Sequence, residues 1–250
     1  MNMVVKASIA TFLLALAAPA MAQEEGQEVI VTGSRIGFTN SGYNSNVPVT
    51  VISSGRPAPG LTLRRSADFA IQQVQVSGDT RDPARRREEI YAMLKKAIET
   101  SGGQGVELAT GDYIVEPLTL ANYTNLGLEE DDDRDDAETA SFLVKVKLAP
   151  GMNAKEALAR ITKFVAAVPT VGRAEMEAQG ELTLSVVSPD QYRTRIIELV
   201  AADAAKATAK FGSGFRVEVS GLDRPVEWQR VGLTDVVLYL PASYSVVPAD

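Results

Sequence analysis

Two residue types are missing from this sequence of 250 residues, which contains neither cysteine nor histidine. Without cysteine there is no disulfide framework, no thiol nucleophile and no thiolate ligand for a metal. Without histidine the chain lacks the commonest general base and the commonest transition-metal ligand. A hydrolase would therefore need a pair of carboxylates or a metal held by oxygen atoms, and no spacing of Asp and Glu indicates either. We expect no catalytic residues, no bound metal and no cofactor.

Positive charge is also in short supply. The chain has 25 Lys and Arg residues against 32 Asp and Glu residues, which gives a formal net charge of −7 at pH 7. Nucleic-acid binding depends on a basic surface. We therefore expect no nucleic acid among the partners, and little attraction to anionic lipid surfaces.

The first 22 residues have the three parts of a cleavable signal peptide. Lys6 supplies the positive charge, Ala7–Ala18 is a short apolar run, and Ala20 and Ala22 are the small residues that a signal peptidase recognises. The run is too short to span a bilayer as a helix, which takes about 20 residues. We expect export to the periplasm, a mature chain that begins near Gln23, and no transmembrane helix after cleavage.

The segment from residue 23 to residue 63 differs in composition from the rest of the chain. It is rich in Gly, Ser, Asn and Pro, and its only β-prone runs are Val29–Thr32 and Val47–Ile52. Such a composition is typical of segments that do not form a core. We predict a flexible, disordered N-terminal arm, with the ordered body beginning near Arg64.

Hydrophobic periodicity in the body alternates between that of strands and that of helices. The predicted strands are Asp68–Ser77, Val106–Val115, Ser141–Leu148, Arg173–Glu177, Glu181–Val187, Phe215–Val219 and Thr234–Val247, and the predicted helices are Pro83–Ser101, a segment capped by Asn153, and Asp190–Phe211. The resulting order is β-α-β-β-α-β-β-α-β-β. Short links between strands require antiparallel pairing. We predict an α+β fold of mostly antiparallel sheet packed by three helices, in two subdomains, 64–149 and 150–250.

Two charged segments each allow two interpretations. The acidic run Glu129–Asp136 is either a solvated loop or a calcium-binding loop, although it lacks the spaced ligands of an EF-hand. A mixed cluster at the start of the first helix either binds an anionic ligand or complements the helix dipole and lines a solvated face. That cluster consists of Asp79, Arg81, Asp82, Arg85, Arg86 and Arg87.

The chain has one tryptophan, Trp228, in a segment predicted to link two late strands. A lone tryptophan in a loop is either a surface anchor for a partner or a cover for an open sheet edge. The sequence does not distinguish these interpretations.

One resemblance lies in the arm. The segment Glu28–Ile36, with the sequence EVIVTGSRI, resembles the TonB box at the mature N-terminus of TonB-dependent outer-membrane receptors. In that family the segment pairs as an added strand with TonB, so that backbone groups supply affinity and alternate side chains supply selectivity. The resemblance implies a partner-binding segment made of Glu28, Val29, Ile30, Val31, Thr32 and Gly33. The predicted helices do not fit a receptor barrel, so the resemblance applies to the arm alone.

A second resemblance covers residues 64–248. The order of strand, long helix, strand and strand, together with the Ala-rich segment Ala201–Gly212, is similar to the SIMPL-domain family of exported bacterial proteins. The resemblance implies an envelope-associated protein that can form oligomers, with no catalytic residues to carry over. We therefore expect a non-enzymatic protein of the periplasm or outer-membrane side that acts through contacts with envelope proteins. The alternative is a TonB-linked transport accessory or receptor-like protein whose arm engages TonB.

Overall fold

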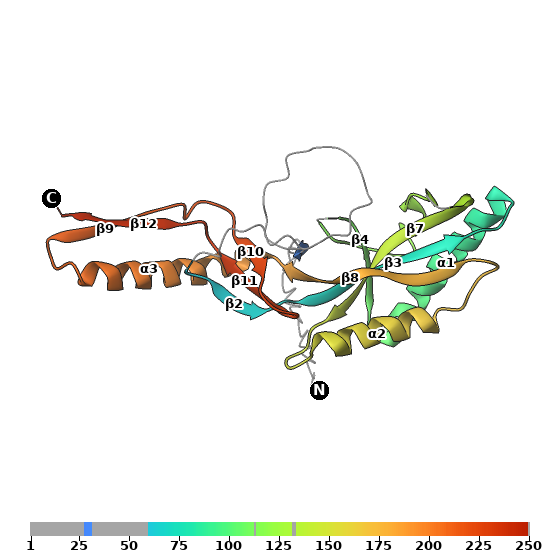
Figure 1. The fold of residues 1–250 in the computed structure, drawn as a ribbon, viewed down its shortest axis with the longest axis horizontal. Helices are drawn as coiled ribbons and strands as arrows, with labels where there is room; N and C mark the ends of the chain where they lie inside the picture. The colour runs from blue at the N-terminus through green and yellow to red at the C-terminus, as the bar shows by residue number, and fades with distance from the viewer. Residues whose placement is uncertain (1–27, 32–59, 113, 132–133, 250) are drawn as a thin grey trace, which may run out of the picture.

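The computed structural model describes residues 28–31, 60–112, 114–131 and 134–249. Within these ranges the fold is α+β, as predicted, with three α-helices: α1 (Pro83–Gln104), α2 (Ala154–Ala167) and α3 (Arg193–Ala209). Figure 1 shows an elongated molecule, with a large sheet covered by α1 and α2 at one end and α3 beside two strands at the other. No helix in the described part of the chain is long and apolar enough to span a bilayer.

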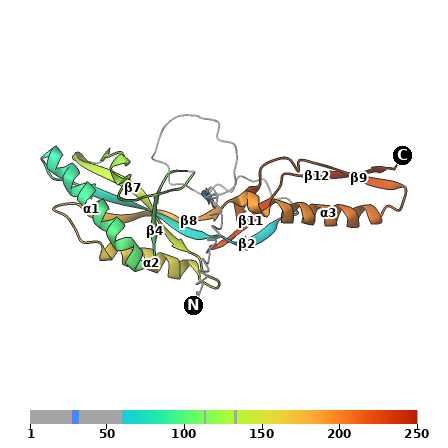
Figure 2. The same cartoon turned by 180° about the vertical axis from the view of Figure 1, so that it is seen from behind.

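The large sheet has seven strands, in the order β1-β8-β3-β7-β4-β5 with β6 paired to β7. Every pairing in it is antiparallel. Its strands are β1 (Glu28–Val31), β3 (Phe69–Gly78), β4 (Glu107–Thr110), β5 (Glu116–Pro117), β6 (Glu129–Asp131), β7 (Arg134–Lys147) and β8 (Glu175–Val187). Figure 2 gives the reverse view, in which α1 and α2 again lie on the same side of this sheet.

Local sequence signals fix the helices over this sheet. Asp82 caps α1 by accepting a hydrogen bond from the backbone N–H of Arg85, and Pro83 opens the helix. The helix continues past Ser101 to Gln104 and is capped by Gly105, whose φ of 66° suits glycine. Asn153 caps α2 as predicted.

Both faces of the large sheet are buried near its middle. Strand β3 alternates, so that Ala70 and Val74 enter the main core beneath the helices while Phe69 and Ile71 point to the other face. There they belong to a second, smaller core. The second core consists of Ile30, Phe69, Ile71, Ala109 and Val115, with Leu143 and Val187 packed against it.

The rest of the described chain forms a small three-stranded sheet and a C-terminal arm, which is distinct from the N-terminal arm of residues 23–63. The small sheet has the order β10-β11-β2, from β2 (Leu63–Ser66), β10 (Glu227–Arg230) and β11 (Asp235–Tyr239). The arm consists of α3 with β9 (Phe215–Ser220) and β12 (Ser243–Pro248), which pair only with each other among the described strands. Two 3₁₀ turns, Tyr123–Asn125 and Pro189–Tyr192, complete the described elements.

Three predicted features differ from the structure. The predicted hairpin around Gly180 is one continuous strand, β8, because a bulge opposite Gln72 absorbs the positive φ of Gly180. The acidic run is not a loop: β6 and β7 pair through it, although residues 132–133 lie outside the described ranges. The predicted strand Thr234–Val247 is two strands in different sheets, β11 and β12. The predicted subdomain boundary near residue 150 stays a prediction, and β8, which follows it, lies in the same sheet as β3 and β7.

Candidate functional site

Strand β1 lies at the edge of the large sheet and is formed by the segment that resembles a TonB box. All four of its residues pair with β8, from Glu28 opposite Val187 to Val31 opposite Leu184. On its other side the backbone N–H of Val115 donates to the carbonyl oxygen of Glu28 at 3.2 Å. Backbone pairing therefore holds β1 on both sides, fully by β8 and in part by the segment before β5.

The side chains of β1 alternate between the two cores. Val29 is 5% exposed and enters the main core, whereas Ile30 is 6% exposed and enters the second core. The prediction that the N-terminal arm (residues 23–63) remains outside the fold is wrong for residues 28–31. These residues join the large sheet because it offers an apolar site on one face for Val29 and on the other for Ile30. Thr32 and Gly33 lie outside the described residues.

Glu28 fastens the strand through a polar cluster on the second-core face. Its carboxylate forms an ion pair with the ammonium of Lys145 and accepts a hydrogen bond of 2.5 Å from the hydroxyl of Ser185. The Lys145 side chain is only 7% exposed, and its ammonium lies 4.1 Å from the centroid of the Phe69 ring. A slip of one residue would turn Glu28 to the opposite, apolar face, so this cluster specifies the register of β1.

A Ser–Lys pair can be a nucleophile and its base, but this one is enclosed. Ser185 is fully buried and its hydroxyl already donates to Glu28. The cluster therefore positions a strand, and the resemblance is the only sequence signal that pointed to Glu28. Nothing in the sequence connected it with Lys145, which is 117 residues away.

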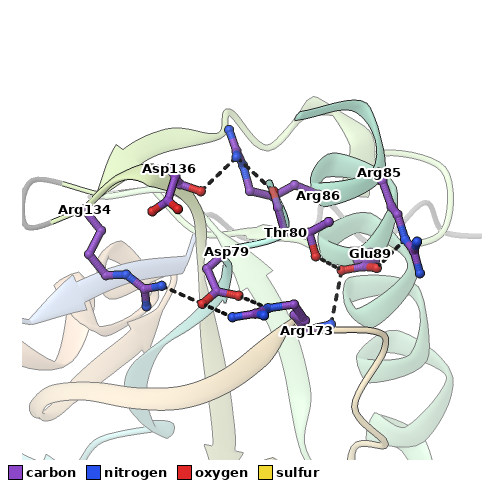
Figure 3. Close-up of polar contacts among 8 residues, drawn as sticks. All are labelled: Asp79, Thr80, Arg85, Arg86, Glu89, Arg134, Asp136 and Arg173. Carbon is purple, nitrogen blue, oxygen red and sulfur yellow. Dashed lines mark hydrogen bonds and ion pairs between the residues drawn. The ribbon is translucent and has the colours of Figure 1, made fainter. Parts of the chain in front are cut away.

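A second polar cluster lies beside α1, where β3 ends and where β7 and β8 begin (Figure 3). Asp79 follows β3 and accepts hydrogen bonds from Nε and Nη2 of Arg173, at 2.5 and 2.7 Å, and from Nη2 of Arg134 at 2.5 Å. A cavity of about 420 Å³ opens beside these groups. Its lining residues are Ser77, Gly78, Asp79, Asp131, Arg134, Ala137, Gly172, Arg173 and Glu175.

Glu89 of α1 completes this cluster (Figure 3). Its carboxylate accepts hydrogen bonds from the Thr80 hydroxyl at 2.6 Å, from Nε of Arg85 at 3.0 Å and from the backbone N–H of Arg173 at 3.1 Å. Gly172 makes this approach feasible, since a Cβ at that position would lie 2.2 Å from the Glu89 carboxyl carbon. Glu89 therefore ties α1 to the turn that leads into β8.

The electrostatics of this cluster favour fixed charges over proton transfer. Hydrogen bonds from Arg173 and then Arg134 hold the pKa of Asp79 well below its usual range. The Thr80 hydroxyl and then the Arg173 backbone N–H lower the pKa of Glu89. Both carboxylates are thus weak proton acceptors, whereas a general base is tuned toward the working pH. The cluster acts as a clasp between strand ends and a helix.

The predicted cluster at the start of α1 is divided by the structure. Asp82 caps the helix, and Arg81 and Arg85 are exposed, in line with the interpretation of a capped, solvated helix start. Arg86 is instead buried, where its Nε donates to Glu138 at 2.8 Å, and Nη2 of Arg87 donates to the same carboxylate at 2.9 Å. Sequence reasoning missed Glu89, which lies further along α1, and also Glu138, Arg134 and Arg173, which come from β7 and from the turn before β8.

Trp228 is not a surface anchor. It is 5% exposed, lies opposite Leu238 in the pairing of β10 with β11, and belongs to the main core. The sequence left two interpretations of Trp228 open, and both assumed a loop. The segment is strand β10 instead, and Trp228 points into the core. No group of three or more potential metal ligands comes together among the described residues. Asp132 and Asp133 of the acidic run lie outside them, so the calcium interpretation stays open.

Comparison with known proteins gives no assignment. No family model matches the sequence, and no curated protein matches it. Two solved structures from Listeria innocua, a hydrolase and an uncharacterized conserved protein, are each 12% identical to this chain, cover 73% of it, and are themselves covered over 91% and 92% of their length. Their TM-scores of 0.15 and 0.13 are too low to support an argument about fold or activity.

Proposed function

We propose that this chain is an exported, non-enzymatic protein of the cell envelope that acts through protein contacts, and that β1 is a strand it exchanges with a partner. One observation carries the proposal. The segment that resembles a strand-addition ligand is a short edge strand, paired with β8 of its own chain. Its sequence and backbone are therefore already suited to the kind of pairing that a partner's open edge would offer.

The energetics of β1 favour an exchangeable strand. Burying Val29 and Ile30 contributes about 3–6 kcal/mol, whereas ordering the backbone of four residues costs about 4–8 kcal/mol. Each net hydrogen bond adds about 0.5–1.5 kcal/mol. Apart from the ion pair of Glu28, these terms balance to within a few kcal/mol. A partner edge of micromolar affinity, equivalent to about 8 kcal/mol, can therefore compete for the strand.

The charged clasp supports the non-enzymatic part of the proposal. Its two carboxylates are shifted toward permanent ionisation, and Arg134 and Arg173 already share Asp79. Such a site suits strand positioning better than acid–base chemistry. The SIMPL resemblance supports a location in the periplasm or at the outer-membrane side. In the alternative function, the partner is TonB and the chain is a TonB-linked transport accessory.

The test loosens β1 without changing its sequence. Lys145→Met removes the ion-pair partner of Glu28, and breaking a buried pair costs about 3–5 kcal/mol. The control, Arg64→Met, removes the same charge from a surface pair with Asp235, where the Arg64 side chain is 66% exposed. Binding to a purified TonB C-terminal domain is measured by calorimetry for the full chain and both variants. We expect Lys145→Met to bind at least about tenfold more tightly than the parent and Arg64→Met to match the parent.

Ile30→Pro provides the opposite change, because proline removes a backbone donor and restricts the chain. It should abolish binding. If neither the parent nor Lys145→Met binds, the TonB alternative fails. The wider proposal is then decided by crosslinking in intact envelopes, where Lys145→Met should give more partner adducts than Arg64→Met. Equal adducts for Lys145→Met, Arg64→Met and Ile30→Pro would reject strand exchange.

A further inference from the structure

We infer that the site occupied by β1 is a peptide-acceptor site, selective for extended segments that carry glutamate followed by two aliphatic residues. The inference rests on the proposed function for the idea that β1 leaves, but it concerns the surface that remains. That surface consists of the β8 edge, the Lys145 ammonium, the Ser185 hydroxyl and the two apolar sites that receive Val29 and Ile30.

Two buried polar side chains recognise the glutamate at the first position of the segment. Lys145 and Ser185 both act on the carboxylate of Glu28, one through charge and the other through a donated hydrogen bond. Charge-assisted hydrogen bonds of this kind are about twice as strong as neutral ones. A glutamine at this position would keep an acceptor for Ser185 but leave Lys145 facing a neutral group.

The next two positions of the segment are recognised by apolar sites that fit aliphatic side chains. Successive side chains on a strand point to opposite faces, so Val29 enters the main core and Ile30 the second core. Both are at most 6% exposed. A charged or polar residue at either position would be buried without a partner. The site therefore selects three consecutive residues, with the backbone of β8 supplying pairing that is independent of sequence.

When β1 leaves the site, Lys145 still has a second carboxylate nearby, so its buried charge keeps a partner. Glu107 of β4 lies opposite Lys145 in the pairing of β4 with β7, with its Oε2 3.4 Å from the Lys145 ammonium, and its side chain is 58% exposed. When Glu28 leaves, this rim carboxylate stays as a partner for the lysine. Glu107 is therefore suited to support Lys145 between occupants.

The experiment measures peptide binding to the full chain by fluorescence anisotropy. The chain carries Ile30→Pro to keep its own strand out of the site, and the labelled probe is the peptide GQEVIVTG, which corresponds to residues 26–33. We expect saturable binding. The parent chain should bind at least about tenfold more weakly, because its own β1 competes at an effective concentration of about millimolar.

Two matched substitutions test selectivity. The Glu28→Gln peptide should bind at least about tenfold more weakly than the native peptide. Adding Lys145→Glu to the chain should reverse the preference, so that a Glu28→Lys peptide binds better than the native peptide. Equal binding of the Glu and Gln peptides, or no saturable binding, would overturn the acceptor site.

Circular dichroism establishes that the Ile30→Pro chain is folded at the assay temperature. If it is not, Glu28→Lys in the full chain replaces it, because a second cation against Lys145 also displaces β1. No partner protein enters this assay. A failure here therefore leaves the TonB and crosslinking results standing, and a failure there leaves peptide binding standing.

Discussion

The large sheet and the C-terminal arm are built from the same kinds of element, but they bury their residues to very different extents. In the large sheet, β3 is flanked by strands on both sides and buried on both faces, with Ala70, Ile71 and Val74 fully inaccessible. In the arm, α3 packs on two strands, and no residue of β9 is buried. Only Ile196, Val200 and Ala204 of α3 are buried. A two-stranded unit with one covering helix has little core of its own, so we expect the arm to open well before the large sheet.

Removing core volume should show this contrast most strongly. Phe164 of α2 is fully buried over the large sheet, and Phe164→Ala should lower the free energy of unfolding by about 3–5 kcal/mol. Val200→Ala in the arm removes two methyl groups and should cost about 1.5–2 kcal/mol. Urea unfolding measures both, and amide exchange locates the loss. Similar losses for the two variants, or exchange protection as strong in β9 as in β3, would contradict the contrast.

A narrower comparison uses two glutamates that face each other in the pairing of β6 with β7. Glu138 is buried between Arg86 and Arg87, whereas its register partner Glu130 is exposed. Glu138→Gln leaves two cations near a neutral amide and should cost about 2–4 kcal/mol. Glu130→Gln should change stability by less than about 0.5 kcal/mol. Thermal unfolding compares them, and a comparable loss for Glu130→Gln would show that the acidic hairpin contributes more than its exposure indicates.

The smallest expected effect concerns pH. Asp79 and Glu89 have lowered pKa values in the folded chain. They therefore contribute stability above the usual carboxyl pKa of the unfolded chain and lose it as the pH falls below about 4. Asp79→Asn should begin less stable at pH 6 and lose less between pH 6 and pH 3. Asp223→Asn, an exposed carboxylate in the loop before β10, is the control and should follow the parent. Parallel curves for all three chains would remove the clasp as a source of acid sensitivity.

The parts of the fold that sequence predicted are those set by neighbouring residues. Asp82, Pro83 and Asn153 mark helix starts through contacts within one turn, and the α+β class follows from the alternating periods. The predicted hairpin at Gly180 failed because a turn and a bulge both accept glycine at positive φ, and only the partner strand decides between them. The segment around Trp228 was predicted as a loop for a similar reason, since the four residues of β10 give too short a pattern to separate a strand from a loop.

The polar sites were harder to predict because their members are distant in the chain. Asp79 meets Arg134 and Arg173 across 55 and 94 residues. Glu28 meets Lys145 across 117 residues. Charge alone does not indicate which arginine or lysine will be buried, and Arg86 differs from Arg85 and Arg87 only by the direction that the helix gives it.

The burial of Lys145 beneath β1 gives this chain a built-in chemical reporter. Amine-reactive reagents modify lysines in proportion to their access to solvent, and the Lys145 side chain is 7% exposed while β1 is in place. Lys206 and Lys210 on the arm are exposed in the same molecule and provide an internal reference. The ratio of labelling at Lys145 to labelling at these two lysines therefore measures the fraction of molecules with β1 released, by peptide mass spectrometry and in intact cells, without any engineered tag.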